Sequence, residues 1–456
     1  MHDEDADVRQ AVIEQILRLD PTADEVTERV QPLLTDRNEE VRAAMVRFLS
    51  RSGKKALLGD LAARLHDDAI VVRRAAVETL RRWGDQVVPH VEPFLDAPST
   101  HTVDATLALL GGLPSKEVRD KMRTWLLHRL DLAHDAVIAE CVMPAVMRAV
   151  TTRLDPMDAL GLESARVTTE PLAILALRDF VGRVVQHVLE GLESLEDPTV
   201  ISNIRRCLET SLRQARGDAM EALSNLREQA VARGLLLLLD DGSPEERLTV
   251  SLGYRHLAAA PPWERISDGL LCHPDRWIRV ASAILAEQTE PGSGGREYLK
   301  TEEYAVMKHL LFLKKVPLFG QMSLEQIEVI SRIVNEVNYY RGEVIFKESE
   351  IGDKLYIIAE GKVSVVKGHR TAGEVTLATL KETDYFGEMS VLDNEPRSAT
   401  IVVDEDSRLL SISGEKLRDI VHQKPEIAFE IFKVLSTRLR RADQKLAEMA
   451  RDARNV

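Results

Sequence analysis

Residues 386–400 read FGEMSVLDNEPRSAT, and this stretch decides how the last third of the chain is interpreted. Gly387 stands directly before a carboxylate, Glu388, and Arg397 follows that carboxylate by nine positions. A glycine lets the backbone come close to a ligand, and the rigid fork of arginine donors suits phosphate oxygens. A short helix beginning near Glu388 would aim further N–H groups at an anion. The stretch therefore predicts a site for a small phosphate ester.

One ligand class matches this chemistry closely. A cyclic nucleotide presents one phosphate charge, a flat base and a single free ribose hydroxyl, because its ring closes through the 3′ and 5′ oxygens. Glu388 would accept a hydrogen bond from the 2′-hydroxyl, and Arg397 would pair with the phosphate. Losing one partner of such a buried charge pair costs about 2–5 kcal/mol.

The same stretch resembles the phosphate-binding cassette of the cyclic-nucleotide-binding domain family. The family pattern is Phe-Gly-Glu, eight or nine residues, and then Arg-Ser/Thr/Ala-Ala. Here eight residues separate Glu388 from Arg397, and Pro396 precedes the arginine as in the kinase regulatory subunits. Upstream, residues 315–319 resemble the first helix and turn of the family and 340–346 its first strand. Residues 352–358 and 360–363 resemble the hairpin that follows.

The resemblance implies a set of ligand-binding residues: Phe386, Gly387, Glu388, Met389, Ser390, Arg397, Ser398 and Ala399. Glu388 would hold the ribose and Arg397 the phosphate, while Ser398 would reach a phosphate oxygen or a guanine amino group. Degenerate members of the family with an empty pocket usually lack the glutamate or the arginine, and both stand here. We expect cyclic AMP, the commoner bacterial ligand, with cyclic GMP as the alternative, and no metal.

Around the cassette, alternating apolar residues predict short strands of a small sandwich or barrel, at 344–346, 355–358, 363–366 and 409–412. Helical patterns flank these strands, from Tyr304 to Val337 and from Ser413 to the end. In the last helix apolar residues recur at intervals of three and four, as in a coiled-coil seam: Phe432, Leu435, Leu439, Ala442, Leu446 and Met449. This helix is expected to be the lid of the pocket and a candidate homodimer contact. The alternative is core packing against the barrel, and both can hold. Asp443 would lie where the lid reaches the base, unless it is simply a solvated carboxylate.

The first 290 or so residues follow a different pattern. Val-Arg pairs begin at residues 8, 41 and 72, next to acidic residues and alanines, and a looser copy spans 275–281. A period of about thirty residues is typical of helical repeat arrays. An aspartate at a helix start accepts backbone N–H groups, and the arginine can pair with an aspartate of the adjacent repeat. The pattern resembles HEAT repeats, less clearly between about 100 and 235, where the helices look longer.

These readings predict an all-α HEAT-like solenoid followed by a β-barrel (jelly-roll) cyclic-nucleotide-binding domain with flanking helices. We expect a HEAT-like domain at 1–288, a flexible linker at 289–303 around the sequence TEPGSGGR, and the binding domain with its lid at 304–456. The first repeat begins almost at residue 1 without a partner helix, so we expect the chain to be a piece of something longer. Similar arrays follow the membrane domain of some bacterial transporters.

Composition narrows the function further. The formal net charge of -14 disfavours binding to nucleic acid or anionic lipid. The three cysteines, Cys141, Cys207 and Cys272, are too far apart to suggest a zinc cluster. The N-terminus lacks a signal peptide and the longest aliphatic run, 235–239, is short. We therefore expect a cytoplasmic protein, or one on the cytosolic side of a membrane.

Catalytic and DNA-binding functions are not expected. The chain has no His-Glu-x-x-His, no Gly-x-Ser-x-Gly and no complete P-loop, so we do not expect an enzyme. It stops at Val456, which leaves no room for a helix-turn-helix after the lid.

Two hypotheses follow. In the first, a cyclic nucleotide at 386–400 controls the HEAT array and its protein partner, either in this chain alone or as the cytosolic regulatory part of a membrane transporter. In the second, the chain is a HEAT scaffold for protein–protein contacts that binds no ligand.

Overall fold

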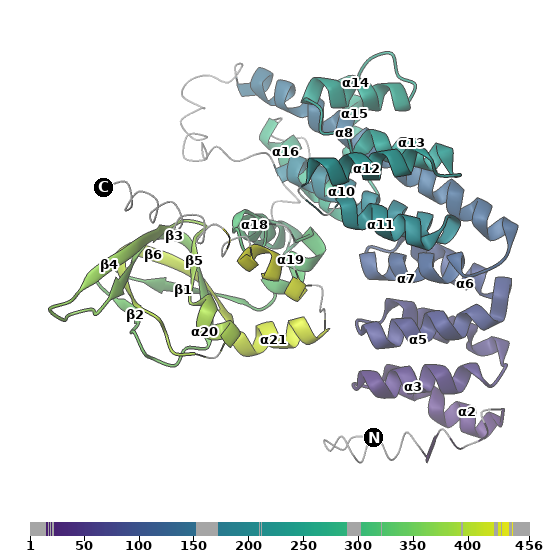
Figure 1. Cartoon of the computed structure of the whole chain (residues 1–456), viewed down its shortest axis with the longest axis horizontal. Helices are drawn as coiled ribbons and strands as arrows, with labels where there is room; N and C mark the ends of the chain where they lie inside the picture. Colours follow the sequence, from purple (N-terminus) through teal and green to yellow (C-terminus); the bar gives the residue numbers. More distant parts are fainter. Residues whose placement is uncertain are drawn as a thin grey trace. The chain divides into compact units, whose positions relative to one another are not determined.

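The structure is a computed structural model that describes residues 22–151, 172–208, 212–289, 302–320, 322–393, 395–423 and 427–436 without 430, together with single positions at 15–20, 210 and 440. The chain divides into two compact units, residues 1–296 and 297–456, which we call the helical unit and the sheet unit (Figure 1). The linker predicted at 289–303 lies almost entirely outside the described residues, so its bounds stay a prediction.

The helical unit begins with short α-helices and 3-10 helices, which stack on one another in chain order (Figure 1). Their bounds are α2 Asp24–Val30, η1 Gln31–Thr35, α3 Glu39–Ser50, η2 Lys55–Leu57, α4 Leu58–Ala62, η3 Ala63–His66, α5 Ile70–Leu80, η4 Arg81–Val87, α6 Val88–Val91, η5 Glu92–Asp96 and α7 Thr100–Gly111. Helix α3 packs against α5 and α5 against α7. Buried Ala43, Ala75 and Ala76 lie in this stack, where small side chains let helix backbones come close.

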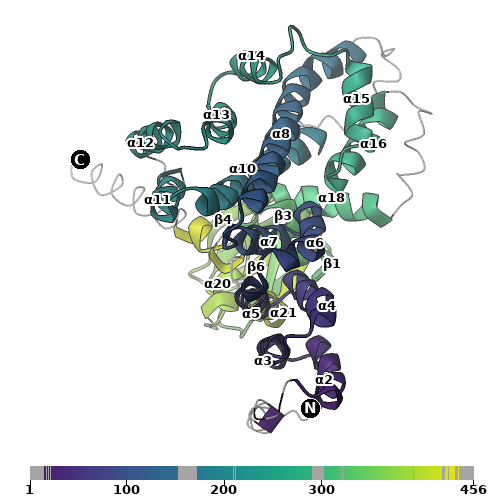
Figure 2. The same ribbon diagram turned by 90° about the vertical axis from the view of Figure 1, so that its right-hand side faces the viewer.

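Longer helices follow, and α8 and α10 cross much of the second view (Figure 2). The bounds are α8 Lys116–Thr151, α10 Leu172–Leu195, α11 Pro198–Leu208, α12 Arg213–Ser224, α13 Gln229–Leu238, α14 Pro244–Tyr254, α15 Trp263–Leu271 and α16 Arg276–Thr289. Helix α10 packs against α7, α8 and α16. With 36 residues in α8 and 24 in α10, the thirty-residue period cannot continue through this region. The weaker repeat pattern after residue 100 has this cause.

The aspartate cap predicted for the repeat helices is present at α16, an asparagine takes its place at α3, and α5 and α7 begin without a side-chain cap. The side chain of Asn38 accepts hydrogen bonds from the amides of Glu40 and Val41 at the start of α3. An Asp275 carboxylate oxygen accepts from the amides of Trp277 and Ile278 at 2.9 and 3.1 Å at the start of α16. Each such cap satisfies amides that the helix itself leaves without a partner.

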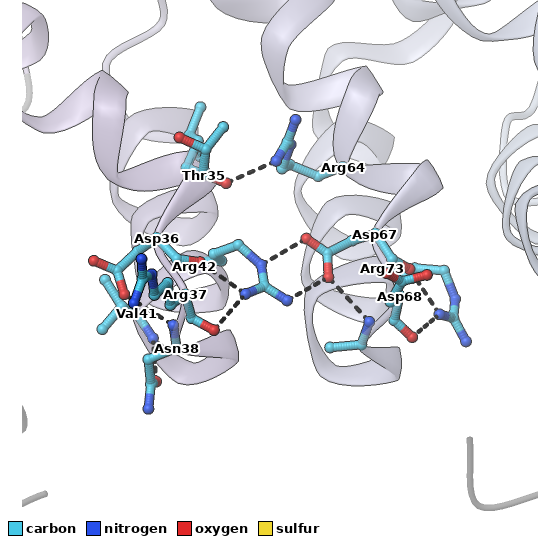
Figure 3. A network of polar contacts seen from close by, with 12 residues as sticks. Thr35, Asp36, Arg37, Asn38, Val41, Arg42, Arg64, Asp67, Asp68 and Arg73 are labelled. Carbon is cyan, nitrogen blue, oxygen red and sulfur yellow. Dashed lines mark hydrogen bonds and ion pairs between the residues drawn. The ribbon is translucent and has the colours of Figure 1, made fainter. Parts of the chain in front are cut away.

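An arginine also joins two adjacent repeats (Figure 3). Arg42 donates from Nε and Nη2 to the two carboxylate oxygens of Asp67, both at 2.7 Å. Its Nη1 donates to the carbonyl of Asp36 at 2.8 Å and so ties the helix to the loop before it. The predicted pairing of a repeat arginine with the next repeat's aspartate is therefore confirmed at this step. The first copy of the pattern, at 7–11, lies outside the described residues.

The sheet unit carries an antiparallel sheet with helices before, within and after it. The helices are α18 Glu302–Lys315, α19 Leu324–Ser331, α20 Glu388–Asp393 and α21 Gly414–Gln423, and the strands are β1 Val334–Tyr339, β2 Val344–Phe346, β3 Lys354–Lys367, β4 Val375–Lys381, β5 Tyr385–Phe386 and β6 Thr400–Ser413. The strand order is β1-β6-β3-β4, with β2 paired to β6 and β5 to β3. Among the described strands the sheet is jelly-roll-like but is not closed into a ring by hydrogen bonds.

Strands β3 and β6 form the spine of this sheet, and they pair from Lys354↔Ser413 to Val366↔Thr400. The two halves of β3 were expected to be the arms of a hairpin, which is wrong: residues 354–367 form one bent strand. The bend lies at Gly361, where φ is +95° and the register shifts. A Cβ there would lie 2.3 Å from the Ser407 hydroxyl oxygen, so only glycine lets β6 pass this close.

A second expectation also fails on this sheet. The helical pattern predicted to run to Val337 ends at Ser331, and residues 334–339 form β1 instead. Its backbone pairs with β6 from Val334↔Ile412 to Tyr339↔Ser407. Tertiary pairing thus overrides a local helical pattern. The core of the sheet unit lies between the two halves of the bent sheet, around buried Tyr356, Ile358, Val363, Phe386, Ile401, Val403 and Leu409.

Among the described helices, none combines the length and apolar character needed to cross a lipid bilayer.

Candidate functional site

The stretch singled out by sequence folds as strand, glycine, short helix and strand. Residues Tyr385–Phe386 form β5 against β3, helix α20 begins at Glu388 as predicted, and β6 begins at Thr400. Gly387 joins β5 to α20 with a φ of +79°, a left-handed conformation that glycine adopts without strain. The local turn therefore depends on the glycine of the motif.

Arg397 is the best-defined side chain of this region. Its guanidinium donates from Nη1 to the carbonyl of Gly387 at 2.8 Å and from Nη2 to the carbonyl of Lys354 at 2.7 Å. Its own backbone amide donates to the carbonyl of Glu350 at 2.8 Å, and its carbonyl accepts from the amide of Ser349 at 2.8 Å. The arginine thus ties the cassette to the first residue of β3 and to the loop before it.

The guanidinium of Arg397 is deeply buried for a charged group. The residue is 4 % exposed, and its guanidinium carbon lies 4.1 Å from the ring centroid of Phe346. Its Nε is buried and has no hydrogen-bond partner within the described structure. Burial lowers the pKa of Arg397, whereas the charges of Asp353, Glu388 and Glu350 oppose that shift. A buried donor without an acceptor is uncommon in proteins, and a phosphate oxygen could accept a hydrogen bond from it.

Two glycines make room for this side chain. A Cβ on Gly387 would lie 2.5 Å from Nη1 of Arg397 and 2.9 Å from the carbonyl oxygen of Lys354. A Cβ on Gly352 would lie 1.9 Å from Nε of Arg397. Sequence reasoning identified Gly387 as part of the site but missed Gly352 and Lys354. Both stand in the segment that resembles the family, yet only the fold brings them against the arginine.

Glu388 opens α20 and is half-buried. Its charge acts on Arg397, since it raises the pKa of that guanidinium. The structure therefore brings the two predicted ligand-binding charges within electrostatic range of each other.

The remaining predicted residues fall into three groups. Phe386, Ser390 and Ala399 are buried, whereas Met389 is 57 % exposed and Ser398 is exposed. The carbonyl of Ser398 accepts from Nζ of Lys367 at 2.9 Å. Asp443 lies outside the described residues, as do four of the six seam residues. The other two, Phe432 and Leu435, belong to the described helical residues 431–436, where Phe432 is 56 % exposed.

Three aromatic side chains pack together next to Arg397. Tyr356 and Phe386 stack with ring centroids 5.4 Å apart and planes at 13°, and Phe346 lies 5.9 Å from Phe386. Burial raises the pKa of Tyr356 to about 12, so its hydroxyl stays neutral. The face of the Phe346 ring, which lies against the Arg397 guanidinium, favours this cation. The chemistry of the region is that of an anion site, and in the described residues no group of three metal-binding side chains lies together.

Known proteins resemble both units. The sequence profile of the family described as "Cyclic nucleotide-binding domain" matches residues 336–424, and that of "HEAT repeats" matches residues 1–81. The chain is 35% identical over 144 residues to the cyclic AMP receptor protein of Thermus thermophilus. The matched region covers 31% of this chain and 67% of that protein. It is 31% identical over 137 residues to a CRP-like cAMP-activated global transcriptional regulator of Mycobacterium tuberculosis, and spans 61% of it.

A solved structure, the catabolite activator protein of Thermus thermophilus, is 34% identical, with 29% of this chain and 63% of that chain covered and a TM-score of 0.27. The chain therefore belongs to the cyclic-nucleotide-binding domain family, and it joins that domain to N-terminal HEAT repeats.

Proposed function

We propose that this protein is a cyclic-nucleotide sensor, in which a nucleotide bound at residues 386–400 controls the HEAT array. The observation that supports this most directly is Arg397, a buried guanidinium on two carbonyls whose Nε has no acceptor within the described structure. A guanidinium that serves only the fold would be expected to use its donors within the protein. A phosphate oxygen supplies what is missing.

In this proposal Glu388 accepts a hydrogen bond from the 2′-hydroxyl of the ribose, and Arg397 pairs with the cyclic phosphate. The amides around Gly387 and Ala399 complete the cradle, and the first turn of α20 adds N–H groups. Phe386 and Ser390 support the cradle from the buried side, while exposed Met389 and Ser398 lie at its rim. Binding requires no covalent step, so we propose a regulator rather than an enzyme.

Cyclic AMP is the proposed ligand. Two relatives of this domain are described by name as a cyclic AMP receptor and as a cAMP-activated regulator. Exposed Ser398 keeps cyclic GMP as the alternative, because its hydroxyl would reach a guanine amino group. Titration with both nucleotides by calorimetry distinguishes them.

The signal would leave the pocket through the C-terminal helix. Residues 427–436 expose two large aromatic side chains, Phe429 at 66 % and Phe432 at 56 %. An apolar helix face of this kind gains from covering the base or from meeting a second copy of the chain. We propose that ligand binding moves this lid and that the HEAT array passes the change to a protein partner. That partner is a cytoplasmic protein or the membrane domain of a transporter.

Titration of a fluorescent cyclic AMP against the full chain tests the proposal. Arg397→Ala removes the phosphate partner, and we expect its affinity to fall at least about thirtyfold, the lower end of the cost of losing one partner of a buried charge pair. Arg408→Gln is the matched control, because Arg408 lies on β6 and pairs at the surface with Glu336 and Glu360. We expect it to bind like the wild type. A wild-type chain without saturable binding would support the alternative, a HEAT scaffold for protein contacts.

A further inference from the structure

A groove of about 1020 Å³ opens on the helical unit, far along the sequence from the nucleotide cassette. It is lined by residues of η5, by α8 from Lys116 to Leu132 and by Pro274. Trp125 forms part of its wall and donates from its indole nitrogen to a carboxylate oxygen of Asp96 at 3.1 Å. Leu95 and Leu132 add apolar surface. The volume is that of a site for a small ligand or for a side chain of a partner.

Arg129 lines this groove, and no carboxylate among the residues that the structure describes is hydrogen-bonded to it. Its guanidinium carbon lies 5.5 Å from the ring centroid of Trp125 and 5.1 Å from that of Phe180. Its Nε is buried and has no hydrogen-bond partner in the part of the chain that the structure describes. Burial and the neighbouring charge of Arg183 lower the pKa of Arg129 to about 10. The group remains a cation at neutral pH, in a place where cations are normally paired.

The nearby carboxylates are already used by other groups. Arg183 donates to Asp179 at 2.9 Å and to Asp275 at 2.6 Å. Asp275 also caps α16, and Asp96 accepts from Trp125. Among the described residues, Arg183 is therefore paired with two carboxylates, whereas the Nε of nearby Arg129 has no acceptor.

A second buried donor near Arg129 also lacks an acceptor. Nδ1 of His273 accepts a hydrogen bond from the amide of Asp275 at 3.0 Å, so the ring proton resides on Nε2. That Nε2 is buried and has no partner within the described residues. His273 is 8 % exposed and meets the same Phe180 ring that Arg129 contacts, with centroids 4.7 Å apart. Two unsatisfied donors on one aromatic ring indicate a missing acceptor.

The charges around the groove limit what that acceptor can be. Glu92, Asp96, Glu117 and Asp120 line it, against Lys116, Lys121 and Arg129. Lys121 pairs with Glu92 at 2.9 Å and Arg123 with Asp120 at 2.6 Å. The lining is thus close to neutral, with one negative charge in excess. A polyphosphate or nucleic acid would be repelled, whereas a single carboxylate on an apolar body suits Arg129 and the surface around Trp125.

We propose that this groove binds a single carboxylate group, which pairs with Arg129 and rests against Trp125. The carboxylate is that of a small apolar acid or of an acidic side chain. The inference does not depend on the nucleotide site.

Thermal unfolding of the full chain, followed by tryptophan fluorescence, tests this proposal. All four tryptophans, Trp83, Trp125, Trp263 and Trp277, lie in the helical unit, so the signal reports that unit. Sodium benzoate supplies a free aromatic carboxylate and N-acetyl-glutamate amide supplies a side-chain carboxylate. Benzamide and N-acetyl-glutamine amide are their uncharged counterparts. At about ten times the dissociation constant, a bound acid is expected to raise Tm by about 2–5 °C.

Two variants separate binding from structure. Arg129→Met is expected to abolish the response to the acids and to raise the Tm of the chain without them, because it removes a cation whose buried Nε has no acceptor among the described residues and keeps an apolar side chain beside Trp125 and Phe180. Arg123→Met, on the same helix, is the matched control. Arg123 donates to both carboxylate oxygens of Glu228, at 2.6 and 2.7 Å. Its loss is expected to lower Tm and to keep the response.

A response to benzoate alone assigns the groove to small acids, and a response to the glutamate derivative as well assigns it also to acidic side chains. The proposal would be overturned if the wild-type chain responded to neither acid, or if the response survived in Arg129→Met. It would also be overturned if Arg129→Met unfolded at a lower temperature than the wild type. The last outcome would give Arg129 a structural role.

Discussion

In both the helical unit and the sheet unit, arginine side chains donate hydrogen bonds to two backbone carbonyls. The two units differ in where those carbonyls lie in the chain. In the repeats, Arg42, Arg73 and Arg279 each donate from Nη1 to the two carbonyls that stand six and five residues earlier. In the sheet unit Arg397 also donates to two carbonyls, but these stand on separate segments, ten and 43 residues away. The repeat arginines thus fasten a helix to its own loop, whereas Arg397 holds distant pieces of chain together.

The arginines also differ in how their other N–H groups are used. Arg42 uses its other N–H groups on Asp67 of the next repeat. In Arg397 Nε stays buried without a partner among the described residues. Arg64 in the repeats also keeps a buried Nε without a partner among the described residues, while its Nη1 donates to the carbonyl of Leu34. An unsatisfied donor therefore does not by itself mark a ligand site, and at Arg397 it is the coincidence with the motif that points to a ligand. The following experiments test that contrast, from the largest expected effect to the smallest.

The largest expected effect is a loss of stability of the helical unit in acid. Burial lowers the pKa of His134 and His273 to about 4 and that of His187 to about 3, all in the helical unit. Below about pH 6.5 the unfolded chain takes up protons at these rings while the folded unit does not, so the stability falls with pH. Above about pH 7 the three rings are neutral in both states and make no difference. Between pH 7 and pH 5 we expect a loss on the order of 5 kcal/mol.

Urea unfolding at the two pH values, followed by tryptophan fluorescence, measures this loss for the helical unit alone. Circular dichroism in the strand region follows the sheet unit in the same samples. Equal midpoints of the fluorescence transition at pH 7 and pH 5 would contradict the assignment of these histidines as buried and neutral.

Removing the partner of a repeat arginine should be the next largest effect. Asp67→Ala leaves Arg42 without its carboxylate, in a pair whose side chains are only 15% and 5% exposed. It also removes the acceptor for the amide of Ala69. We expect the helical unit to lose about 3 kcal/mol in the same urea experiment. Glu25→Ala breaks a pair with Arg29 that is exposed on both sides and should change little.

A smaller effect is expected where a glycine makes room for Arg397. Gly352→Ala places a methyl group against Nε of the arginine, so the guanidinium must shift and the affinity for fluorescent cyclic AMP should fall about ten- to hundredfold, or about 1–3 kcal/mol. Gly342→Ala is the control for backbone strain, since Gly342 has a φ of +87° but nothing within 4 Å of the added Cβ. Unchanged affinity in Gly352→Ala would show that Arg397 does not meet the ligand from this position.

The smallest loss of stability is expected from a feature that the two units share. Each contains a capping box, Ser243 with Glu246 at the start of α14 and Ser323 with Gln326 at the start of α19. Replacing either serine by alanine should cost about 1 kcal/mol. The fluorescence transition measures the first change and circular dichroism the second. A much larger loss in one unit would mean that its cap holds more than the first turn of a helix.

Much of the sheet unit could be predicted from sequence because its chemistry is local. The start of α20 at Glu388, the left-handed Gly387 and the strands around Phe346 and Ile412 follow from motif and alternation. Strand β1 could not, since its partner in β6 lies more than sixty residues away. The same holds for Gly352 and Lys354, which gain their role only when β3 folds against the cassette.

In the helical unit the predictable part was the contact between neighbours. The Arg42–Asp67 pair follows from a period of about thirty residues, and the caps follow from residue types at helix starts. The unsatisfied Arg129 could not be predicted. Its position follows from the packing of both α8 and α16 against α10, and Arg183 on α10 takes the carboxylates of Asp179 and Asp275. Nothing in the order of residues 125–129 distinguishes it from a solvated arginine on a helix surface.

The two glycines beneath Arg397 have a consequence for comparing relatives. The motif at 386–400 contains the glutamate and the arginine, but Gly352 stands 45 positions before the arginine and has no room for a side chain beside its Nε. A relative with a bulkier residue at the position of Gly352 must hold its arginine differently, even if the motif is intact. Position 352 is therefore a marker, readable from sequence, that can separate members keeping this arrangement from those that retain only the letters of the motif.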